Sequence, residues 1–336
     1  MSVIRHSLEP AKGPVFVVGC ARSGTTLLYH TLLSSGGFAT YLAEPAVFDL
    51  LVPKFGDLSV PKNRRMLMNC WLKSKMFRAS GLNREQIETM ILSQCTGNGD
   101  FLAIVMGEVA RAQGVDRWAV WGPDNLLYIP QIKKELPRAL FIHMIRDGRD
   151  VALSLHKEKW IRPFPWDKRQ ALLVAALHWL WKVNRGRRHG QLLGPDYLEV
   201  RFEDLVTKPR TTLSRISHFI GHDLDYDRIQ RNAVGTLSLS NSSFRLSRTE
   251  SESEPIGRWR VLLSQSDISL LESVLGPLLL EFGYHVTQCE LKSDLKTDLR
   301  KIIYSTLYEA KLWCKAKTPL GRLTSTGRLR LSQRVN

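Results

Sequence analysis

Short runs of consecutive apolar residues recur along the chain, and turn-forming or charged residues follow most of them. A continuous apolar run of this length, rich in β-branched and aromatic residues, is typical of a strand buried on both faces of a sheet. The pattern predicts five strands, at residues 15–19, 39–42, 118–121, 139–145 and 197–202.

Between these runs, apolar residues return at the three- and four-residue spacing that marks one face of a helix. This spacing predicts helices at residues 25–34, 60–95, 123–137, 168–185 and 203–221. Because strands and helices alternate, the expected fold is α/β, with a central, mostly parallel sheet flanked by helices on both faces.

Two stretches depart from this alternation. Residues 238–254 are rich in serine and charge and poor in core residues, which predicts a mobile loop. Residues 290–336 combine helical apolar spacing with eleven Lys/Arg and four Asp/Glu, a net charge of +7. Such a segment either packs on the domain or lies on a membrane or partner surface. We expect an N-terminal arm (1–13), one α/β domain (14–288) and a basic C-terminal helix and tail (289–336).

The overall charge narrows the class of partner. The chain has 48 Lys+Arg and 32 Asp+Glu, and its net charge of +16 attracts polyanions such as nucleic acid, anionic membranes, acidic polysaccharides or a highly charged nucleotide. Nucleic acid is not expected, because no helix-turn-helix, RNP or zinc signature accompanies the charge. Hydrophobic residues make up 43% of the chain, as in folded soluble proteins.

Cysteine usage and hydropathy favour a cytoplasmic protein. The five cysteines form no C-x-x-C pair, which argues against a disulfide framework or a zinc site and fits reduced thiols. No apolar run reaches the roughly 18 residues that a membrane span needs. The N-terminal stretch MSVIRHSLEPAKGP lacks the apolar core of a secretory signal.

The first predicted strand runs into a glycine-rich loop with the sequence VFVVGCARSGTT. Gly19 and Gly24 keep the frame G-x-x-x-x-G-K-[ST] of a nucleotide-triphosphate loop, but Thr25 replaces the lysine that serves the outer phosphates. The glycines allow a tight turn, and backbone N–H groups at the start of the following helix converge on an anion. Thr26 keeps the hydroxyl of the motif. Without the lysine, we expect an anion with less charge than a magnesium-bound triphosphate.

A second candidate follows the predicted strand 139–145, in the sequence RDGRDVALS. Arg146 at the strand end is able to bind a phosphate bidentately, and Ser154, eight residues on in the next helix, is placed to bind the same group. The alternative is structural, with an Arg–Asp network bracing the turn. That network would consist of Arg146, Asp147, Arg149 and Asp150.

Taken together and in this order, the two motifs resemble those of the sulfotransferase superfamily, whose donor is 3′-phosphoadenosine 5′-phosphosulfate (PAPS). FVVGCARSGTTLL is similar to that family's 5′-phosphosulfate loop, and HMIRDGRDVALS is similar to its 3′-phosphate motif. EVRFEDLVTKP looks like the strand and turn that follow, and IGRWRVLLS and LGPLLLEFGY look like the C-terminal cofactor loop and closing helix. The resemblance covers roughly residues 14–286 and implies a P-loop-NTPase-like sulfotransferase fold.

The resemblance also implies roles for individual residues. Arg22 would contact the bridging or sulfuryl oxygens, where negative charge grows during an in-line transfer that requires no metal ion. Trp259 would lie near adenine, with its neighbouring arginines near phosphate. The implied nucleotide-binding residues are Cys20, Ala21, Arg22, Ser23, Gly24, Thr25, Thr26, Arg146, Ser154, Arg258, Trp259 and Arg260.

The acceptor hydroxyl also needs a base. Glu44 stands where the branch of the family that acts on protein tyrosines has its catalytic glutamate, just past the second predicted strand. The alternative is that Glu44 is a structural cap or pairs with Arg22. His143 and His178 are other candidate bases, but their positions in a strand and a helix favour packed side chains.

Two positions depart from the family pattern. Trp121 stands where many relatives have the lysine of a K-x-P motif, which helps to neutralise the leaving group. Lys159 or an arginine of the GRWR sequence takes over that role, or the leaving group is stabilised less. Phe202 replaces a tyrosine often found there, which removes a hydroxyl from the nucleotide site.

The resemblance places the acceptor beside residues 156–168, HKEKWIRPFPWDK. Trp160, Phe164 and Trp166 are candidates to stack on a sugar or aromatic ring, with core packing as the alternative for Trp166. Three basic neighbours suit an acidic acceptor, namely Lys157, Lys159 and Arg162.

We therefore expect a PAPS-dependent sulfotransferase that acts on a hydroxyl of a carbohydrate or glycoconjugate. Protein tyrosine and a small metabolite are the alternative acceptors. A P-loop nucleotide kinase is the rival from the same fold class, and a non-enzymatic polyanion-binding protein is the rival from another class.

Overall fold

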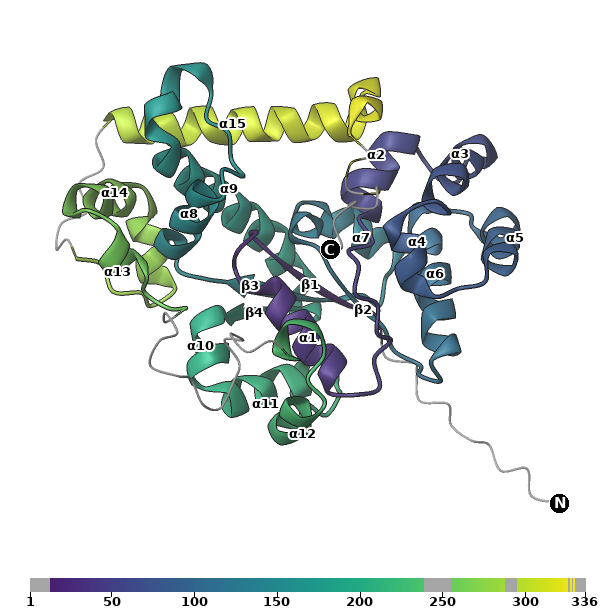
Figure 1. Ribbon diagram of the computed structural model, residues 1–336. Coiled ribbons are helices and arrows are strands. Elements are labelled where there is room, and N and C mark those ends of the chain that lie inside the picture. The colour runs from purple at the N-terminus through teal and green to yellow at the C-terminus, as the bar shows by residue number, and fades with distance from the viewer. Residues whose placement is uncertain (1–12, 239–254, 288–294, 326, 328, 330–336) are drawn as a thin grey trace, which may run out of the picture.

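A computed structural model describes residues 13–238, 255–287 and 295–325, together with residues 327 and 329. Its centre is a parallel four-stranded sheet in the order β2-β1-β3-β4 (Figure 1). The strands are β1 (Val15–Gly19), β2 (Ala119–Trp121), β3 (Leu140–Ile145) and β4 (Tyr197–Arg201). These four strands were predicted from their apolar runs, and the α/β fold is confirmed.

The predicted strand at residues 39–42 is wrong. A single parallel bridge joins Phe38 to Arg117 just ahead of β2, and the chain then leaves the edge of the sheet. The apolar side chains that suggested a strand serve the core instead, since Ala39 and Tyr41 are buried. The hydroxyl of Tyr41 donates to the carbonyl oxygen of Met76, 3.0 Å away. Burial by helices, rather than a place in the sheet, explains the run.

Helices cover both faces of the sheet (Figure 1). One face packs against α1, α11 and α12, and the other against α7 (Ile129–Glu135) and α9, on which α8 and α14 pack in turn. Their bounds are α1 (Thr25–Ser34), α8 (Gly148–Lys157), α9 (Ala171–Gly190), α10 (Phe202–Thr207), α11 (Pro209–Ile220), α12 (Tyr226–Arg231), α13 (Trp259–Leu262) and α14 (Gln265–Glu281). The predicted helix at 203–221 is two helices, because Pro209 begins a new one.

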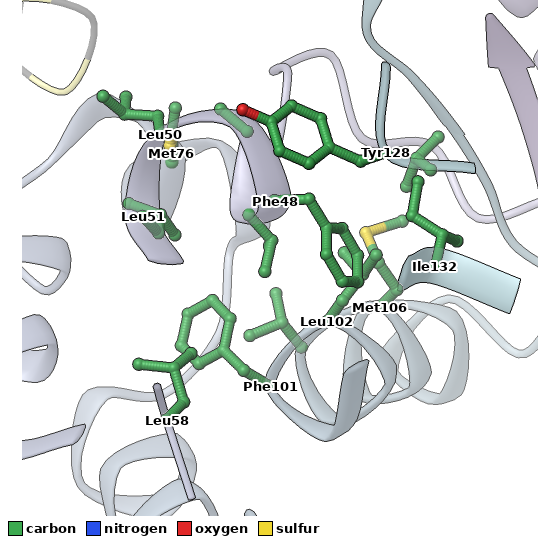
Figure 2. Close-up of a cluster of buried hydrophobic side chains, with 14 of the residues drawn as sticks. Phe48, Leu50, Leu51, Leu58, Met76, Phe101, Leu102, Met106, Tyr128 and Ile132 are labelled. Carbon is green, nitrogen blue, oxygen red and sulfur yellow. The ribbon is translucent and has the colours of Figure 1, made fainter. Parts of the chain in front are cut away.

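A helical layer, which comes mainly from the segment between β1 and β2 and ends with α7 after β2, forms a further hydrophobic cluster that includes Phe48, Phe101 and Met106 (Figure 2). Its helices are α2 (Val52–Phe55), α3 (Pro61–Trp71), α4 (Lys75–Ser80), α5 (Arg84–Gln94), α6 (Asn98–Ala112) and α7 (Ile129–Glu135). The helical prediction for residues 60–95 is confirmed, with breaks at the Ser74 N-cap and at Gly81, which has φ +66°. A 3-10 helix, η2 (Pro123–Tyr128), connects β2 to α7.

The basic C-terminal segment contains the long helix α15 (Leu295–Lys317), which lies across α9 and ends near α2 (Figure 1). Glu309 accepts a hydrogen bond of 2.8 Å from Trp181 Nε1 and pairs with Arg185, and Tyr304 Oη donates to Asp167 at 2.8 Å. The helix therefore packs on the domain. Its outer side leaves Leu295 and Leu299 exposed, and contact of that side with a membrane or partner stays a prediction.

Within the described part of the chain, no helix is both long and apolar enough to cross a membrane. The predicted mobile loop at residues 238–254 lies outside the described residues, apart from Ser238 at its start.

Candidate functional site

The glycine-rich loop is a tight turn between β1 and α1. Its backbone needs glycine at position 24, where φ is +89° and a Cβ atom would lie 2.4 Å from the ring of Phe202. Position 19 is also restricted, because a Cβ there would lie 2.5 Å from the carbonyl oxygen of Met144. Arg22 adopts φ +72°, a strained value for a side chain other than glycine. The turn is thus set by close packing on the ends of β3 and β4.

A cavity of about 510 Å³ opens over this turn at the carboxyl ends of the strands, where parallel sheets bind their ligands. Members of the predicted nucleotide-binding set line it, namely Ala21, Arg22, Gly24, Thr25, Thr26, Arg146 and Arg258. A recess of about 120 Å³ beside it contains Ser154 and shares Arg22, Arg146 and Arg258 with the cavity. The structure therefore gathers two motifs that are more than 100 residues apart in the sequence.

Arg22 and Ser154, from the two motifs, are in direct contact. The Nε atom of Arg22 donates a hydrogen bond of 2.8 Å to Ser154 Oγ. The same guanidinium lies 5.4 Å from the centroid of the Trp160 ring, within cation–π distance. Arg22 is exposed at the cavity, so its positive charge faces the space where an anion would bind.

Arg146 completes the link between the motifs. One Nη atom donates to the carbonyl oxygen of Arg22 at 3.0 Å, and the other donates to the carbonyl oxygen of Pro255. The guanidinium lies 4.5 Å from the ring centroid of Phe202, so the phenylalanine that replaces a tyrosine forms a flat support for Arg146. Burial lowers the pKa of Arg146, and Asp150, 3.8 Å away, opposes that shift.

The Arg–Asp network considered from the sequence also exists, but its centre is Arg149. This buried guanidinium pairs with Asp147 at 2.8 Å and with Glu272 at 2.6 Å. Asp150 accepts hydrogen bonds from the backbone N–H groups of Gly257 and Trp259, at 2.8 and 3.0 Å. In this one turn, Arg149 therefore braces the structure, while Arg146 lines the cavity.

Trp259 and Arg260 lie away from the cavity. Trp259 is 2% exposed, and the Arg149 guanidinium stacks on its ring at 3.6 Å. Arg260 is exposed and lies 4.9 Å from the same ring. Of the three predicted residues in the GRWR sequence, Arg258 is the one that lines the cavity.

Two small side chains of the turn point inward. The thiol of Cys20 is fully buried, and burial raises its pKa to about 12. The Ser23 hydroxyl oxygen is also buried, and no other described residue bonds to it. A buried hydroxyl in this state calls for a partner, which a ligand or an ordered water supplies.

Glu44 is half-buried beside the turn that follows β2. Its Oε1 atom lies 3.1 Å from where a Cβ atom on Gly122 would be, and the neighbours of that glycine, Trp121 and Pro123, line the cavity. The predicted base is therefore at the edge of the cavity, although its segment is not a strand.

The two histidines considered as bases are in the interior. His143 is fully buried in β3, with Nδ1 2.6 Å from Tyr197 Oη, and burial lowers its pKa to about 3. Burial lowers the pKa of His178 to about 3 as well. The expectation that His143 is a packed residue is confirmed, and His178 lines a different cavity behind Trp160.

Comparison with known proteins identifies the same family that the two motifs resemble. A family model described as "Sulfotransferase family" matches residues 14–226. The chain belongs to the sulfotransferase family. A curated protein of Caenorhabditis briggsae described as "Putative protein-tyrosine sulfotransferase" is 23% identical over 282 residues, covering 80% of this chain and 88% of that protein.

Solved sulfotransferase structures are also similar. The sulfotransferase domain from the Synechococcus PCC 7002 olefin synthase is 18% identical, with a TM-score of 0.49, and the match covers 82% of this chain and 98% of that one. Mouse sulfotransferase SULT7A1 complexed with PAP is 12% identical, with a TM-score of 0.43, and the match covers 82% of this chain and 90% of that one.

Trp121, at the position of the K-x-P lysine of many sulfotransferases, lines the cavity, and the sequence offers Lys159 and the GRWR arginines as candidate replacement cations. Lys159 is exposed and does not line the cavity, whereas Arg258 does. Lys182 of α9 is a cation that the sequence analysis missed. It is buried close to Cys20 and pairs with Asp124. Burial works to lower the pKa of Lys182, but the attraction of Asp124 outweighs it, so the net shift is upward and the amine stays charged.

The three aromatic residues proposed for this sulfotransferase's acceptor side divide into two groups. Trp160 is 54% exposed and lines the cavity beside Arg22. Phe164 and Trp166 stack on each other, with ring centroids 4.9 Å apart, and neither lines that cavity. Trp166 is 65% exposed, so core packing does not describe it.

Proposed function

We propose that the protein transfers a sulfuryl group from PAPS to a hydroxyl group of a carbohydrate acceptor. The observation that supports this most directly is the contact chain from Arg146 to the Arg22 backbone and from the Arg22 side chain to Ser154, at the edge of one cavity. Two guanidinium groups at the edge of one cavity suit a nucleotide that has a phosphosulfate at one end and a ribose 3′-phosphate at the other. Membership of the sulfotransferase family supports the same donor.

The proposed reaction is an in-line displacement at sulfur. The acceptor oxygen attacks the sulfur atom, the bond from sulfur to the 5′-phosphate oxygen breaks, and its electron pair leaves with 3′-phosphoadenosine 5′-phosphate (PAP). Arg22 stabilises the charge that grows on the departing oxygen, supported by backbone N–H groups of the turn. Glu44 accepts the hydroxyl proton, a contribution of roughly 10²–10⁴ in rate for a well-placed base.

The acceptor is the finer part of this proposal. The exposed ring of Trp160 beside the cavity suits stacking on a sugar face, and the basic surroundings suit an acidic sugar. A protein tyrosine is the second candidate, favoured by the description of the C. briggsae relative.

The proposal is tested by replacing Arg22, the residue expected to act on the transition state. In Arg22→Ala we expect turnover with labelled PAPS to fall roughly 10²–10³-fold, as for loss of one oxyanion-stabilising donor. The affinity for PAP should fall less than turnover does, because Arg146 and the backbone N–H groups of the turn remain to bind its phosphates. Turnover is measured with fractions of glycans, peptides, lipids and small metabolites as acceptors, and affinity by calorimetric titration of PAP.

The matched control is Arg78→Ala, which removes one exposed arginine from α4 and should leave both quantities unchanged. Tighter binding of magnesium-ATP than of PAP would refute the proposal in favour of a nucleotide kinase. Binding of polyanions without measurable binding of PAP would refute it in favour of a non-enzymatic role.

A further inference from the structure

A second cavity, of about 370 Å³, adjoins the proposed nucleotide cavity, which is the cavity of about 510 Å³ over the turn between β1 and α1. Trp160 lines both cavities, and the consecutive residues Pro123 and Asp124 of η2 line one each. Its walls come from η2, from α9 and from the C-terminal helix α15, which contributes Tyr308, Leu312 and two lysines. Trp160, whose ring centroid lies 5.4 Å from the Arg22 guanidinium, is therefore shared by the second cavity and the cavity that Arg22 lines.

The second cavity is strongly basic. Four cationic side chains line it, namely Arg162, Lys182, Lys311 and Lys315. The acidic side chain in the lining is Asp124, which pairs with Lys182. Lys311 and Lys315 are one helical turn apart on α15, so their ammonium groups approach the cavity from the same side. The charge of Asp124 is thus already matched by Lys182, and the other three cations favour an anionic ligand.

Three residues of the second cavity's lining each have a polar atom that lacks a partner among the described residues. Tyr128 Oη, His178 Nδ1 and Tyr308 Oη are buried, and no described residue bonds to any of them. A buried polar atom without a partner costs about 1–3 kcal/mol. Because burial keeps His178 neutral, its ring can offer one donor and one acceptor. Three such atoms in one small space call for a ligand with several hydroxyl groups.

We propose that this second cavity binds the acceptor, and that the acceptor is an acidic saccharide whose carboxylate or sulfate is held by Lys311 and Lys315 of α15. The inference rests on the proposed sulfotransferase function. A saccharide offers the several hydroxyl groups that the unpartnered atoms need, whereas a single phenol offers one. The aromatic walls agree with this ligand, because Trp181 and Tyr308, whose ring centroids lie 5.0 Å apart, both line the cavity and give a sugar ring an apolar contact.

This proposal gives the C-terminal helix a direct part in specificity. The family model matches residues 14–226, so α15 lies beyond the portion of the chain that the family model describes. The contact of Glu309 with Trp181 and Arg185 fixes α15 against α9 and places its lysines at the cavity. Most of the donor-cavity lining therefore comes from the family portion, with Arg258 outside it, and the two lysines of the acceptor site come from α15, also outside it.

The test compares two saccharides with the full-length protein in the presence of saturating PAP. The probes are a uronic-acid-containing hexasaccharide and its carboxyl-reduced, uncharged counterpart. For Lys311→Gln/Lys315→Gln we expect the dissociation constant of the acidic probe to rise roughly 10- to 100-fold, as for loss of charge-assisted hydrogen bonds. Binding of the uncharged probe should change less than twofold, and Lys311→Arg/Lys315→Arg should restore binding of the acidic probe.

The matched control is Lys296→Gln/Lys317→Gln, which removes the same charge from two exposed lysines of α15 that do not line the cavity. Equal weakening by both double variants would overturn the proposal, because it would show a general effect of charge. Unchanged binding of the acidic probe in Lys311→Gln/Lys315→Gln would overturn it too. Binding of an acidic tyrosine peptide in preference to either saccharide would overturn the saccharide assignment.

The donor is measured separately in every protein by titration of PAP. Normal PAP binding together with lysine-independent saccharide binding refutes this inference and leaves the sulfotransferase function standing. Failure of the wild-type protein to bind PAP refutes the function on which the inference rests. A melting curve for each variant confirms that the lysine substitutions leave the protein folded.

Discussion

Arg146 holds two main-chain segments together at the nucleotide cavity. Its two Nη atoms donate to the carbonyl oxygens of Arg22 and Pro255, while its Nε atom is buried with no partner among the described residues. Burial lowers the pKa of Arg146, and an anion bound beside it would oppose that effect in the way that Asp150 does. The side chain is thus both a structural link and a group with spare hydrogen-bonding capacity for a ligand.

This dual use leads to a prediction about the 3′-phosphate. In Arg146→Ala we expect the dissociation constant of PAP to rise about 10- to 100-fold, since a hydrogen bond to a charged group contributes about 1.5–3 kcal/mol. Adenosine 5′-phosphate, which lacks the 3′-phosphate, should lose far less affinity. Calorimetric titration of both nucleotides against both proteins measures the difference. Equal losses for the two nucleotides would mean that Arg146 supports the loop without binding the 3′-phosphate.

At the scale of elements, the turn between β1 and α1 depends on how closely it packs. Gly24 and Gly36 both have positive φ, +89° and +80°, at the two ends of α1. A Cβ atom at Gly24 would lie 2.4 Å from the Phe202 ring, whereas one at Gly36 would meet nothing within 4 Å. Both positions therefore need a residue that tolerates positive φ, but a Cβ atom would clash with its surroundings at Gly24 and not at Gly36.

We expect Gly36→Ala to lower the free energy of unfolding by about 1–2 kcal/mol, the cost of a left-handed residue with a Cβ atom. Gly24→Ala should cost a further 1–3 kcal/mol or so, because Phe202 has to move, and should also weaken PAP binding by displacing the backbone N–H groups of the turn. Urea unfolding and PAP titration measure these effects. A Gly24→Ala protein no less stable than Gly36→Ala would show that Phe202 yields without cost.

Continuous apolar runs gave reliable predictions of strands where the run pairs with both neighbours, as in β1 and β3. The same signal failed at residues 39–42, because the apolar side chains there are buried by helices while the backbone makes no ladder. A short apolar run does not reveal whether it is buried inside a sheet or beneath helices.

The lining of the cavity over the turn was largely predictable, because motif spacing places Arg22 and Arg146 there and Ser154 in the recess beside it. The buried position of Trp259 was not predictable, because its stacking on Arg149 depends on a contact between residues 110 positions apart in the sequence. The lysines of α15 were missed for the same reason, because they reach the second cavity only through the packing of α15 on α9. Lys182 did carry a signal, as a single charge in the apolar sequence ALLVAALHWLWKV.

At the scale of the whole molecule, stability depends on keeping buried histidines neutral. Burial lowers the pKa of His143 from 6.5 to about 3, and that of His178 by a similar amount. Between those pH values the unfolded chain binds a proton at each position that the folded protein does not. The contribution of these two neutral histidines to the free energy of unfolding is fully present above pH 6.5 and falls as the pH drops toward 3.

Each such histidine contributes a slope of about 1.4 kcal/mol per pH unit to the free energy of unfolding over that interval. We expect His143→Gln to show a slope shallower by about that amount between pH 6 and 4, whatever its absolute stability. Burial raises the pKa values of Asp150 and Glu203, which act in the opposite direction, but these groups are common to both proteins. Urea unfolding at several pH values measures the slope, with His156→Gln, an exposed position, as the control. An unchanged slope in His143→Gln would contradict the prediction.

The position of Cys20 has a consequence for how this site withstands reactive chemicals. Oxidants and alkylating reagents attack the thiolate, and at Cys20 both the upward pKa shift and the absence of exposed surface keep that form scarce and inaccessible. Peroxide or a maleimide should therefore modify the partly exposed Cys70 and Cys314 before Cys20. A covalent inhibitor aimed at the turn between β1 and α1 would need a chemistry directed at some residue other than its cysteine.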